Sequence, residues 1–364
     1  MIVCRLLGRT KWAFCLVAIL TLVPVSASAQ ELSAAKPLDQ AYSVSKTART
    51  ETQYSDVIKL CEQALQGTLS QKQTAYARQL SAWAHNRRGE LLADTGFEQE
   101  ALADFVAAVE LEPSNWRARH NRGVSFATAG QYTEAAADFD AVVKAKPDFA
   151  AAWFNRGELR SQQDDYRGAV QDYDQALRLE PGDAAVLTAR GHAYYQQGNV
   201  PSALVDFNKA IQLDKGKALT YVYRAAALAD SGKYAEAADD YRAGIRLDPK
   251  SAAAYQATAW MMATCADERF RDPQLAVKAA ERAVELRAAD DSRDQETLAA
   301  AYASAGQYDR AVAAQQKAID LLEPGAARLK QALEERLQLY QQQRPYHELR
   351  EARKHGGTVR RAKS

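Results

Sequence analysis

An all-α fold of the solenoid type, built from stacked helical hairpins, is predicted for this 364-residue chain by two observations. First, small, alanine, aromatic and proline positions recur every 34 residues between about 82 and 251. Second, the apolar residues inside each period follow the spacing of one helix face. A single helix pair of this length cannot bury its apolar face, so neighbouring pairs must stack. The sequence therefore predicts a repeat protein that offers extended surface rather than an enzyme with a deep pocket.

Four kinds of position carry the period. The small position holds, in order, Gly89, Gly123, Gly157, Gly191 and Ala225. The alanine position holds Ala101, Ala135, Ala169, Ala203 and Ala237. The aromatic position holds Phe105, Phe139, Tyr173, Phe207 and Tyr241. The units close at Pro113, Pro147, Pro181 and Pro249, and Lys215 replaces the proline once.

These offsets resemble the tetratricopeptide repeat family, and the match is closest in the units that start at 82, 116, 150, 184 and 218. Looser units flank them, and the resemblance covers roughly residues 38–325. It implies a right-handed superhelix of about seven to eight helical hairpins, closed by a C-terminal capping helix. The resulting organisation is an atypical hairpin with a lead-in helix over 30–81, five regular units over 82–251, two variant units over 252–325 and a capping helix over 326–343.

The unit from 252 carries about five extra residues between its helices, in the stretch Arg269-Phe270-Arg271-Asp272-Pro273. It resembles a variant hairpin of bacterial members of the family. We expect a longer turn braced by an Arg–Asp pair and by packing of Phe270. The alternative is a protruding loop that contacts a partner.

Residues 1–29 have the pattern of a removable signal peptide. Arg5, Arg9 and Lys11 precede an apolar stretch of about 14 residues, and Ala27-Ser28-Ala29 provides a cleavage site before Gln30. That stretch is shorter than the roughly 20 residues that span a bilayer. We expect a periplasmic or secreted protein that starts at Gln30; an uncleaved membrane anchor is the alternative.

The last helix of the pattern carries Leu329, Leu333, Leu337 and Tyr340 on one face. The tail over 344–364 has a net charge of +5 and is expected to be partly disordered past about 355. The full chain has a net charge of +1, so the three basic groups of the signal and the +5 of the tail leave −7 on the repeat body. A mildly acidic body argues against nucleic-acid binding. A weak contact of the basic tail with an anionic cell surface remains an alternative to a solvated terminus.

Only Cys61 and Cys265 remain after the signal. They are six hairpins apart, so no disulfide within one chain is expected. Cys61 occupies a packing position, whereas Cys265, beside the inserted turn, is expected to be more exposed. The glycines fit helix contacts and turns rather than a phosphate loop, and the histidines lack paired metal spacing. We therefore predict no enzyme, no cofactor and no metal.

The family resemblance implies that the first helix of each pair lines a groove that binds partner peptides. Asn121 and Asn155 match the groove asparagines of the family. Arg87, Arg117 and His120 are the basic candidates, and the groove becomes aromatic past residue 184. The candidate binding residues are Asn86, Arg87, Glu90, Arg117, His120, Asn121, Phe154, Asn155, Glu158, His192, Tyr195 and Tyr223. A peptide with one acidic and one apolar end would suit this polarity.

The sequence thus predicts an exported scaffold, without catalytic activity of its own, that binds a protein or peptide. Two alternatives remain open. One is a permanent accessory subunit of a cell-envelope enzyme or of a transport or assembly complex. The other is a membrane-tethered scaffold with an uncleaved signal anchor.

Overall fold

The computed structural model describes residues 31–323 and 325–348. In this part of the chain there are seventeen α-helices, one 3-10 helix and no strand. The chain divides into two compact units, which meet between Asp164 and Asp165. The expected signal and cleavage site, and the tail past 348, lie outside the described residues.

The first unit contains α1 (Glu31–Ser45), α2 (Glu51–Leu65), α3 (Gln71–Thr95), α4 (Glu98–Leu111), α5 (Trp116–Thr128), α6 (Tyr132–Ala145) and α7 (Ala150–Gln162). The second unit contains α8 (Tyr166–Leu179), α9 (Ala184–Gln196), α10 (Val200–Leu213), α11 (Ala218–Asp230), α12 (Tyr234–Leu247), α13 (Ala252–Thr264), η1 (Glu268–Phe270), α14 (Pro273–Leu286), α15 (Ser292–Ser304), α16 (Tyr308–Asp320) and α17 (Ala327–Gln341).

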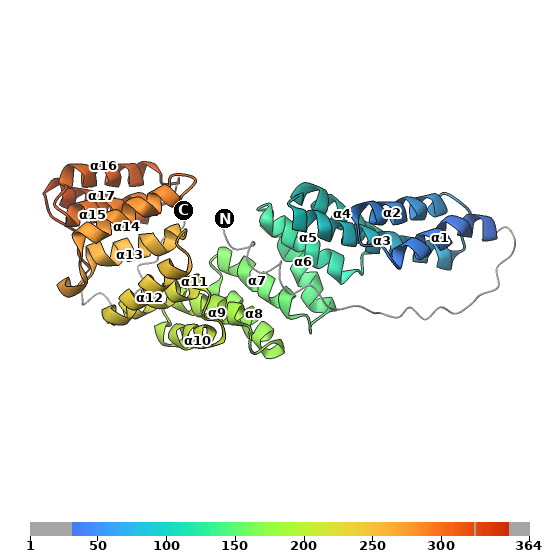
Figure 1. Ribbon diagram of the computed structural model, residues 1–364, viewed down its shortest axis with the longest axis horizontal. Coiled ribbons are helices and arrows are strands. Elements are labelled where there is room, and N and C mark those ends of the chain that lie inside the picture. Colours follow the sequence, from blue (N-terminus) through green and yellow to red (C-terminus); the bar gives the residue numbers. More distant parts are fainter. Residues whose placement is uncertain (1–30, 324, 349–364) are drawn as a thin grey trace. The chain divides into compact units, whose positions relative to one another are not determined.

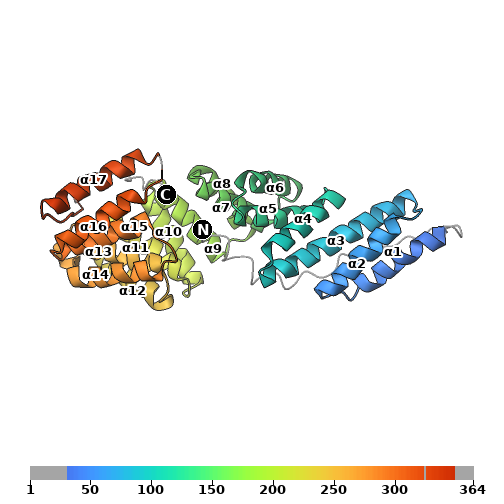
Figure 2. The same cartoon turned by 90° about the horizontal axis from the view of Figure 1, so that it is seen from above.

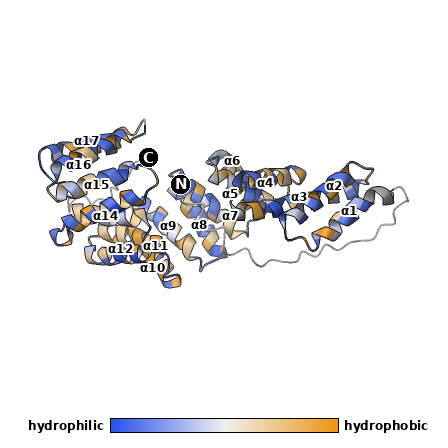
Figure 3. Cartoon of the chain, turned by 45° about the horizontal axis from the view of Figure 1, so that its top comes forward, coloured by the Kyte–Doolittle hydropathy of each residue, from blue (hydrophilic) through white to orange (hydrophobic). Residues whose placement is uncertain are grey.

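Helices that follow one another in the chain lie side by side in pairs, among them α3 with α4, α5 with α6, α9 with α10 and α11 with α12 (Figures 1 and 2). Each helix carries both hydrophobic and hydrophilic residues, as an amphipathic helix that packs on one face requires (Figure 3). The fold is the predicted all-α solenoid.

Local signals in the sequence set the helix ends. Asp165 caps α8 by accepting a hydrogen bond from the Gly168 amide at 2.9 Å. Pro181 and Gly182 follow α8, and Asp183 then caps α9 by accepting a bond from the Ala185 amide at 2.8 Å. The predicted close of this repeat at Pro181 is therefore confirmed.

Within each 34-residue repeat, the small position determines how closely the two helices approach each other. A Cβ atom on Gly191 would lie 2.7 Å from Cε1 of Phe207, whose ring is fully buried. In the unit from 218 the small position is Ala225, and a glycine stands on the second helix instead. A Cβ on Gly244 would lie 2.8 Å from Cγ2 of Val222, so this glycine provides the close approach there.

The start of the first unit differs from the expected period. Helix α3 runs without interruption over 25 residues and thus begins well before residue 82. Ser70 caps it in a capping box with Gln73, and the helix then continues through Gly89, with no Pro in it, as far as Thr95. The hairpin of α1 and α2 packs on α3, with Tyr54, Cys61 and Ala64 of α2 buried, and Cys61 thus lies in the packing position that was predicted for it.

The variant turn in the second unit contains an Arg–Asp pair and a packed Phe270, as expected, but the aspartate of the pair is not Asp272 of the expected stretch. The aspartate is Asp267, which accepts from Nη2 of Arg269 at 2.7 Å. The ring of Phe270 contacts that of Tyr234 at a centroid distance of 5.7 Å. Asp272 instead caps α14, accepting from the Leu275 amide at 3.0 Å.

Helix α17 is the predicted cap, and it packs on α16 with Leu333 and Tyr340 fully buried. Gln315, which replaces the usual aromatic, is also fully buried and donates from Nε2 to the Leu333 carbonyl at 2.9 Å.

Both described cysteines are free thiols. Cys265, expected to be more exposed, is only 1% exposed because it lies in a core cluster with Met261 and Tyr234. Within the described ranges, no helix combines the length and the apolar character needed to cross a membrane.

Candidate functional site

In each unit the first helices of successive pairs contact one another and form a row. This first-helix row consists of α3, α5 and α7 in the first unit, and of α9, α11, α13 and α15 in the second. All twelve candidate binding residues lie on these helices. The row is therefore the place to ask which of their side chains face a partner.

Four candidates on α3 and α5 form one polar network. Nδ2 of Asn121 donates to Oδ1 of Asn86 at 3.0 Å and to Oε1 of Glu90 at 3.1 Å. Nδ2 of Asn86 donates to the same Glu90 oxygen at 2.8 Å, and Nη1 of Arg87 donates to its other oxygen at 2.7 Å. Asn86 is buried, whereas about half of the Arg87 side chain is exposed. The Asn121 amide, expected to bond a peptide, thus also links two helices.

His120 joins α5 to α7, and it is not the basic group that the sequence predicted. Its side chain is only 3% exposed, and its Nε2 accepts a hydrogen bond from Nδ2 of Asn155 at 2.9 Å. The rings of Phe139 and Phe149 pack beside it. Burial lowers the pKa of His120 to about 4, so the imidazole is neutral at pH 7.

The remaining candidates of the first unit differ in exposure. Phe154 is buried among the helices, and Glu158 on the same helix is half-buried. Arg117 is exposed, with its guanidinium 4.3 Å from the centroid of the Trp116 ring. Arg87 and Arg117 are therefore the basic candidates that reach the surface.

In the second unit the candidates His192, Tyr195 and Tyr223 lie on α9 and α11. The rings of His192 and Tyr223 stack at 4.4 Å with an interplanar angle of 23°. Desolvation lowers the pKa of His192 to about 4, and its Nε2 accepts from Nε2 of Gln196 at 3.0 Å. The hydroxyl of Tyr195 donates to Asp230 at 2.7 Å. The stacked rings of His192 and Tyr223 are thus uncharged at pH 7 and half-buried.

A second periodic feature was not found from the sequence. The residue before each small position is an arginine, and an aspartate follows it 16 residues later on the second helix. Arg122 donates to Asp138 from Nε at 2.7 Å and from Nη2 at 2.8 Å. The same two-bond pairing joins Arg88 to Asp104, Arg190 to Asp206 and Arg224 to Asp240. The recurrence of both residues at the 34-residue period was a signal that could have revealed it.

Some of these arginines also reach the second helix of the preceding repeat. Nη1 of Arg190 donates to Asp174 on α8 at 2.7 Å, in addition to its bonds with Asp206 on α10. Hydrogen bonding to these carboxylates raises the pKa of Arg190 further. Burial alone would raise the pKa of Asp104, but hydrogen bonds from Arg88 and His85 outweigh it and lower that pKa. These periodic Arg–Asp pairs, which we call the Arg–Asp ladder, therefore hold the helices of a repeat together, and some of them also link neighbouring repeats.

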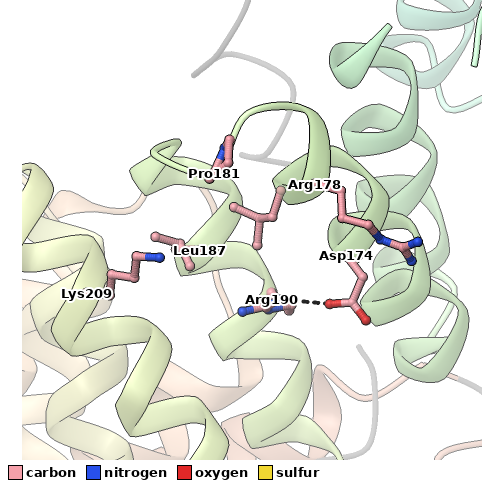
Figure 4. Close-up of a pocket in the computed structure, with 7 residues that line it drawn as sticks. Asp174, Arg178, Pro181, Leu187, Arg190 and Lys209 are labelled. Carbon is pink, nitrogen blue, oxygen red and sulfur yellow. Dashed lines mark hydrogen bonds and ion pairs between the residues drawn. The ribbon is translucent and has the colours of Figure 1, made fainter. Parts of the chain in front are cut away.

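A depression of about 310 Å³ lies beside this ladder in the second unit. Figure 4 shows Arg190 pointing toward Asp174, with Arg178, Pro181, Leu187 and Lys209 around them. It contains none of the candidate binding residues. In the described parts of the chain, no group of three or more His, Cys, Asp or Glu side chains is arranged to hold a metal ion.

Three family models, each described as tetratricopeptide repeat, match the chain. One matches residues 86–148, 121–160 and 154–218, another 218–251, and the third 296–321. No curated protein matches.

Solved structures with a similar fold include a tetratricopeptide repeat protein from Parabacteroides merdae, at 19% identity and a TM-score of 0.55, over 71% of this chain and 98% of that one. PilF of Pseudomonas aeruginosa is similar at 19% identity and 0.51, over 60% and 97%. The Cut9–Hcn1 hetero-tetramer of the APC/C is similar at 14% and 0.59, over 85% and 57%. At these identities the likeness concerns the fold.

Proposed function

Because this chain belongs to the tetratricopeptide repeat family, whose repeats act as scaffolds for protein–protein interaction, we propose that it binds an extended segment of a partner along the first-helix row. The observation that carries the proposal is the row itself. Within each unit its candidate side chains gather on neighbouring first helices: Arg87, Glu90 and Asn121 form a polar surface on the first unit. On the second unit, His192, Tyr195 and Tyr223 form an aromatic one.

The polarity of the row supports the choice of ligand. Arg87 and Arg117 reach the surface on the first unit and attract a carboxylate. The stacked pair of His192 and Tyr223 on the second unit is uncharged at pH 7 and suits an apolar side chain. We therefore propose acidic residues for the part of a partner that binds the first unit and apolar residues for the part that binds the second.

We further propose that the scaffold is exported and has no catalytic activity of its own. The basic, apolar and small-residue pattern of residues 1–29 supports export to the periplasm or the medium. The state of the reactive side chains supports a non-catalytic role: burial raises the pKa of Cys61 to about 12, and Cys265 is buried as well. N-terminal sequencing of the mature protein should give Gln30; an intact Met1 would contradict export by cleavage.

The binding proposal is tested with a partner recovered by co-purification with the full chain and then titrated calorimetrically. Arg87→Ala and Asn121→Ala should each weaken its affinity, the exposed arginine by about tenfold. Arg242→Ala is the matched control, because Arg242 is exposed on the second helix α12 and forms only an exposed ion pair with Asp239. Unchanged affinity in both first-helix variants, or an equal loss in the control, would contradict the assignment of the row.

A further inference from the structure

The segment that follows α17 returns to the first-helix row of the second unit. The amide of Glu348 donates to the carbonyl of Thr264 at 2.8 Å, and Nε1 of Trp260 donates to Oε1 of Glu348 at 3.1 Å. Thr264 is the last residue of α13, whose final carbonyls lack partners inside the helix. The segment thus supplies a main-chain donor that the end of α13 requires, and its carboxylate is held by an indole.

The aromatic residue of the segment has a separate seat. The Tyr346 ring lies 6.0 Å from the Trp260 ring, and the guanidinium of Arg336 on α17 lies 4.6 Å from the Tyr346 centroid. The same guanidinium lies 5.4 Å from the Trp260 centroid and pairs with Glu296 on α15. Tyr346 therefore packs against a tryptophan and a cation that a carboxylate fixes in place.

Two residues of this site, Trp260 and Glu296, occupy repeat positions that carry candidate binding residues in other repeats. Trp260 follows the small residue Ala259, as His192 follows Gly191. Glu296 stands three residues before Ala299, as Asn86 stands three before Gly89. A stretch of chain without regular secondary structure, residues 344–348, thus lies on the surface that in the other repeats carries the candidate binding residues.

We propose that Trp260, Thr264, Glu296 and Arg336 form a site for an extended peptide with an aromatic residue two positions before a carboxylate. The chain's own Tyr346-His347-Glu348 is its resident ligand, and a partner segment of the same chemistry displaces it. The displacement rests on the proposed peptide-binding function, whereas the occupancy by residues 344–348 does not.

The size of the competition follows from effective concentration. A tethered segment this close to its site acts at an effective concentration on the order of 1 mM. If a short peptide binds the empty site with a Kd of about 0.1 mM, the resident segment weakens its apparent affinity about tenfold. Weakening the resident segment should restore that factor.

The probe is a fluorescein-labelled, C-terminally amidated peptide with the sequence of residues 343–348, titrated by fluorescence anisotropy. The full-length double variant Tyr346→Ala/Glu348→Gln should bind it about tenfold more tightly than the unmodified chain. His347→Ala is the matched control, because His347 lies exposed between the two altered residues. It should bind as the unmodified chain does. If circular dichroism shows that the double variant is unfolded, the full-length Glu348→Ala variant, which removes the acceptor of the Trp260 indole, replaces it.

A second substitution ties the gain to the site. Trp260→Phe in the released background keeps a ring but removes the indole N–H that Glu348 accepts. It should weaken the probe several-fold, yet leave a probe with Ala in place of the last Glu, which offers no acceptor to the indole, almost unchanged. Equal affinities of the unmodified and released chains, or no effect of Trp260→Phe, would show that residues 344–348 are only a structural cap and overturn the proposal.

These outcomes are separable from the fate of the proposed function. The probe is a synthetic copy of the chain's own segment, so its binding depends on no partner. If Arg87→Ala and Asn121→Ala both leave the partner affinity unchanged, the proposed function is contradicted. The site occupied by residues 344–348 is unaffected by that result.

Discussion

Asp138 on α6 is only 2% exposed and accepts two hydrogen bonds from Arg122. Replacing it with asparagine keeps the shape but leaves the guanidinium without a charged partner in a largely buried place. Breaking such a pair from one side costs about 3–5 kcal/mol when it is fully buried, and less where an amide still accepts. We expect Asp138→Asn to lower the free energy of unfolding by about 2–3 kcal/mol, measured by urea denaturation.

The control lies two residues further along the same helix. Asp140 also pairs with an arginine, Arg156 at 2.7 Å, but its side chain is 62% exposed. Exposed ion pairs contribute about 0–1 kcal/mol, so Asp140→Asn should change stability by less than about 1 kcal/mol. Equal losses in the two variants would show that burial does not set the worth of the ladder.

His120 gives the first unit a pH dependence of known sign. Its pKa is about 4 in the folded chain and about 6.5 when unfolded, so the unfolded state binds more protons between these values. The stability contribution is therefore complete above about pH 6.5 and is lost as the pH falls toward 4, by at most about 3 kcal/mol.

We expect the urea concentration at the unfolding midpoint to decrease when the pH is lowered from about 7 to about 4.5. The decrease should be smaller in His120→Phe. A matching decline in the variant would assign the pH dependence to other groups, such as His192.

At this scale the sequence predicted the packing residues better than the polar ones. The aromatic, alanine and glycine positions were identified because size alone recurs at the period. Arg122 and Asp138 lie on different helices and are 16 residues apart in the chain. Their pairing therefore depends on how the two helices are aligned, which composition does not show. The burial of His120 was missed because a groove position was assumed to face solvent.

In the regular helix pairs, a glycine allows the two helices to approach closely, as Gly191 does. A Cβ on Gly191 would lie 2.7 Å from the buried Phe207 ring, and such overpacking costs about 1–3 kcal/mol, whereas replacing a helical glycine with alanine gains up to about 1 kcal/mol. The packing cost should win. We expect Gly191→Ala to lower the free energy of unfolding by about 1–2 kcal/mol in chemical denaturation.

Gly182 provides the contrast within the same unit. It lies between α8 and α9, has no positive φ, and a Cβ there meets no atom within 4 Å. Gly182→Ala should be neutral or stabilise by up to about 1 kcal/mol, because it restricts the unfolded chain. Destabilisation by both substitutions to the same extent would refute the packing explanation for Gly191.

Most elements could be predicted because the turn residues and the apolar spacing repeat together. The exceptions have local causes. Helix α3 was expected to begin near residue 82, but the capping box at Ser70 starts it earlier, and no proline lies between there and Gly96 to end it. Residues 344–348 were assigned to a tail, because their contacts with Trp260 and Thr264 depend on residues more than eighty positions away.

On the scale of the whole molecule, helix contacts are concentrated between helices one or two apart in the chain, and the C-terminal segment reaches back to α13, so damage at one end should stay local. Leu333 on the capping helix is fully buried, and Leu333→Ala should cost about 2–5 kcal/mol locally. Hydrogen exchange followed by mass spectrometry should show lost protection in α15–α17 and unchanged protection in α2 and α3.

Leu337→Ala, at a half-buried position on the same helix, should cause a smaller change in α15–α17. Loss of protection throughout the chain after Leu333→Ala would mean that the molecule unfolds as one cooperative body.

The uninterrupted α3 decides where this protein can be divided for laboratory work. A recombinant fragment that starts at the first regular repeat would cut α3 in its middle and strip the α1–α2 hairpin from the exposed stump. The fragment would lack Ala77 and Leu80, which that hairpin covers, together with half of the helix. Trp83 and Ala84 would become exposed to solvent. Cloning boundaries in the loop before Ser70 keep α3 whole, although they still uncover its face toward α2.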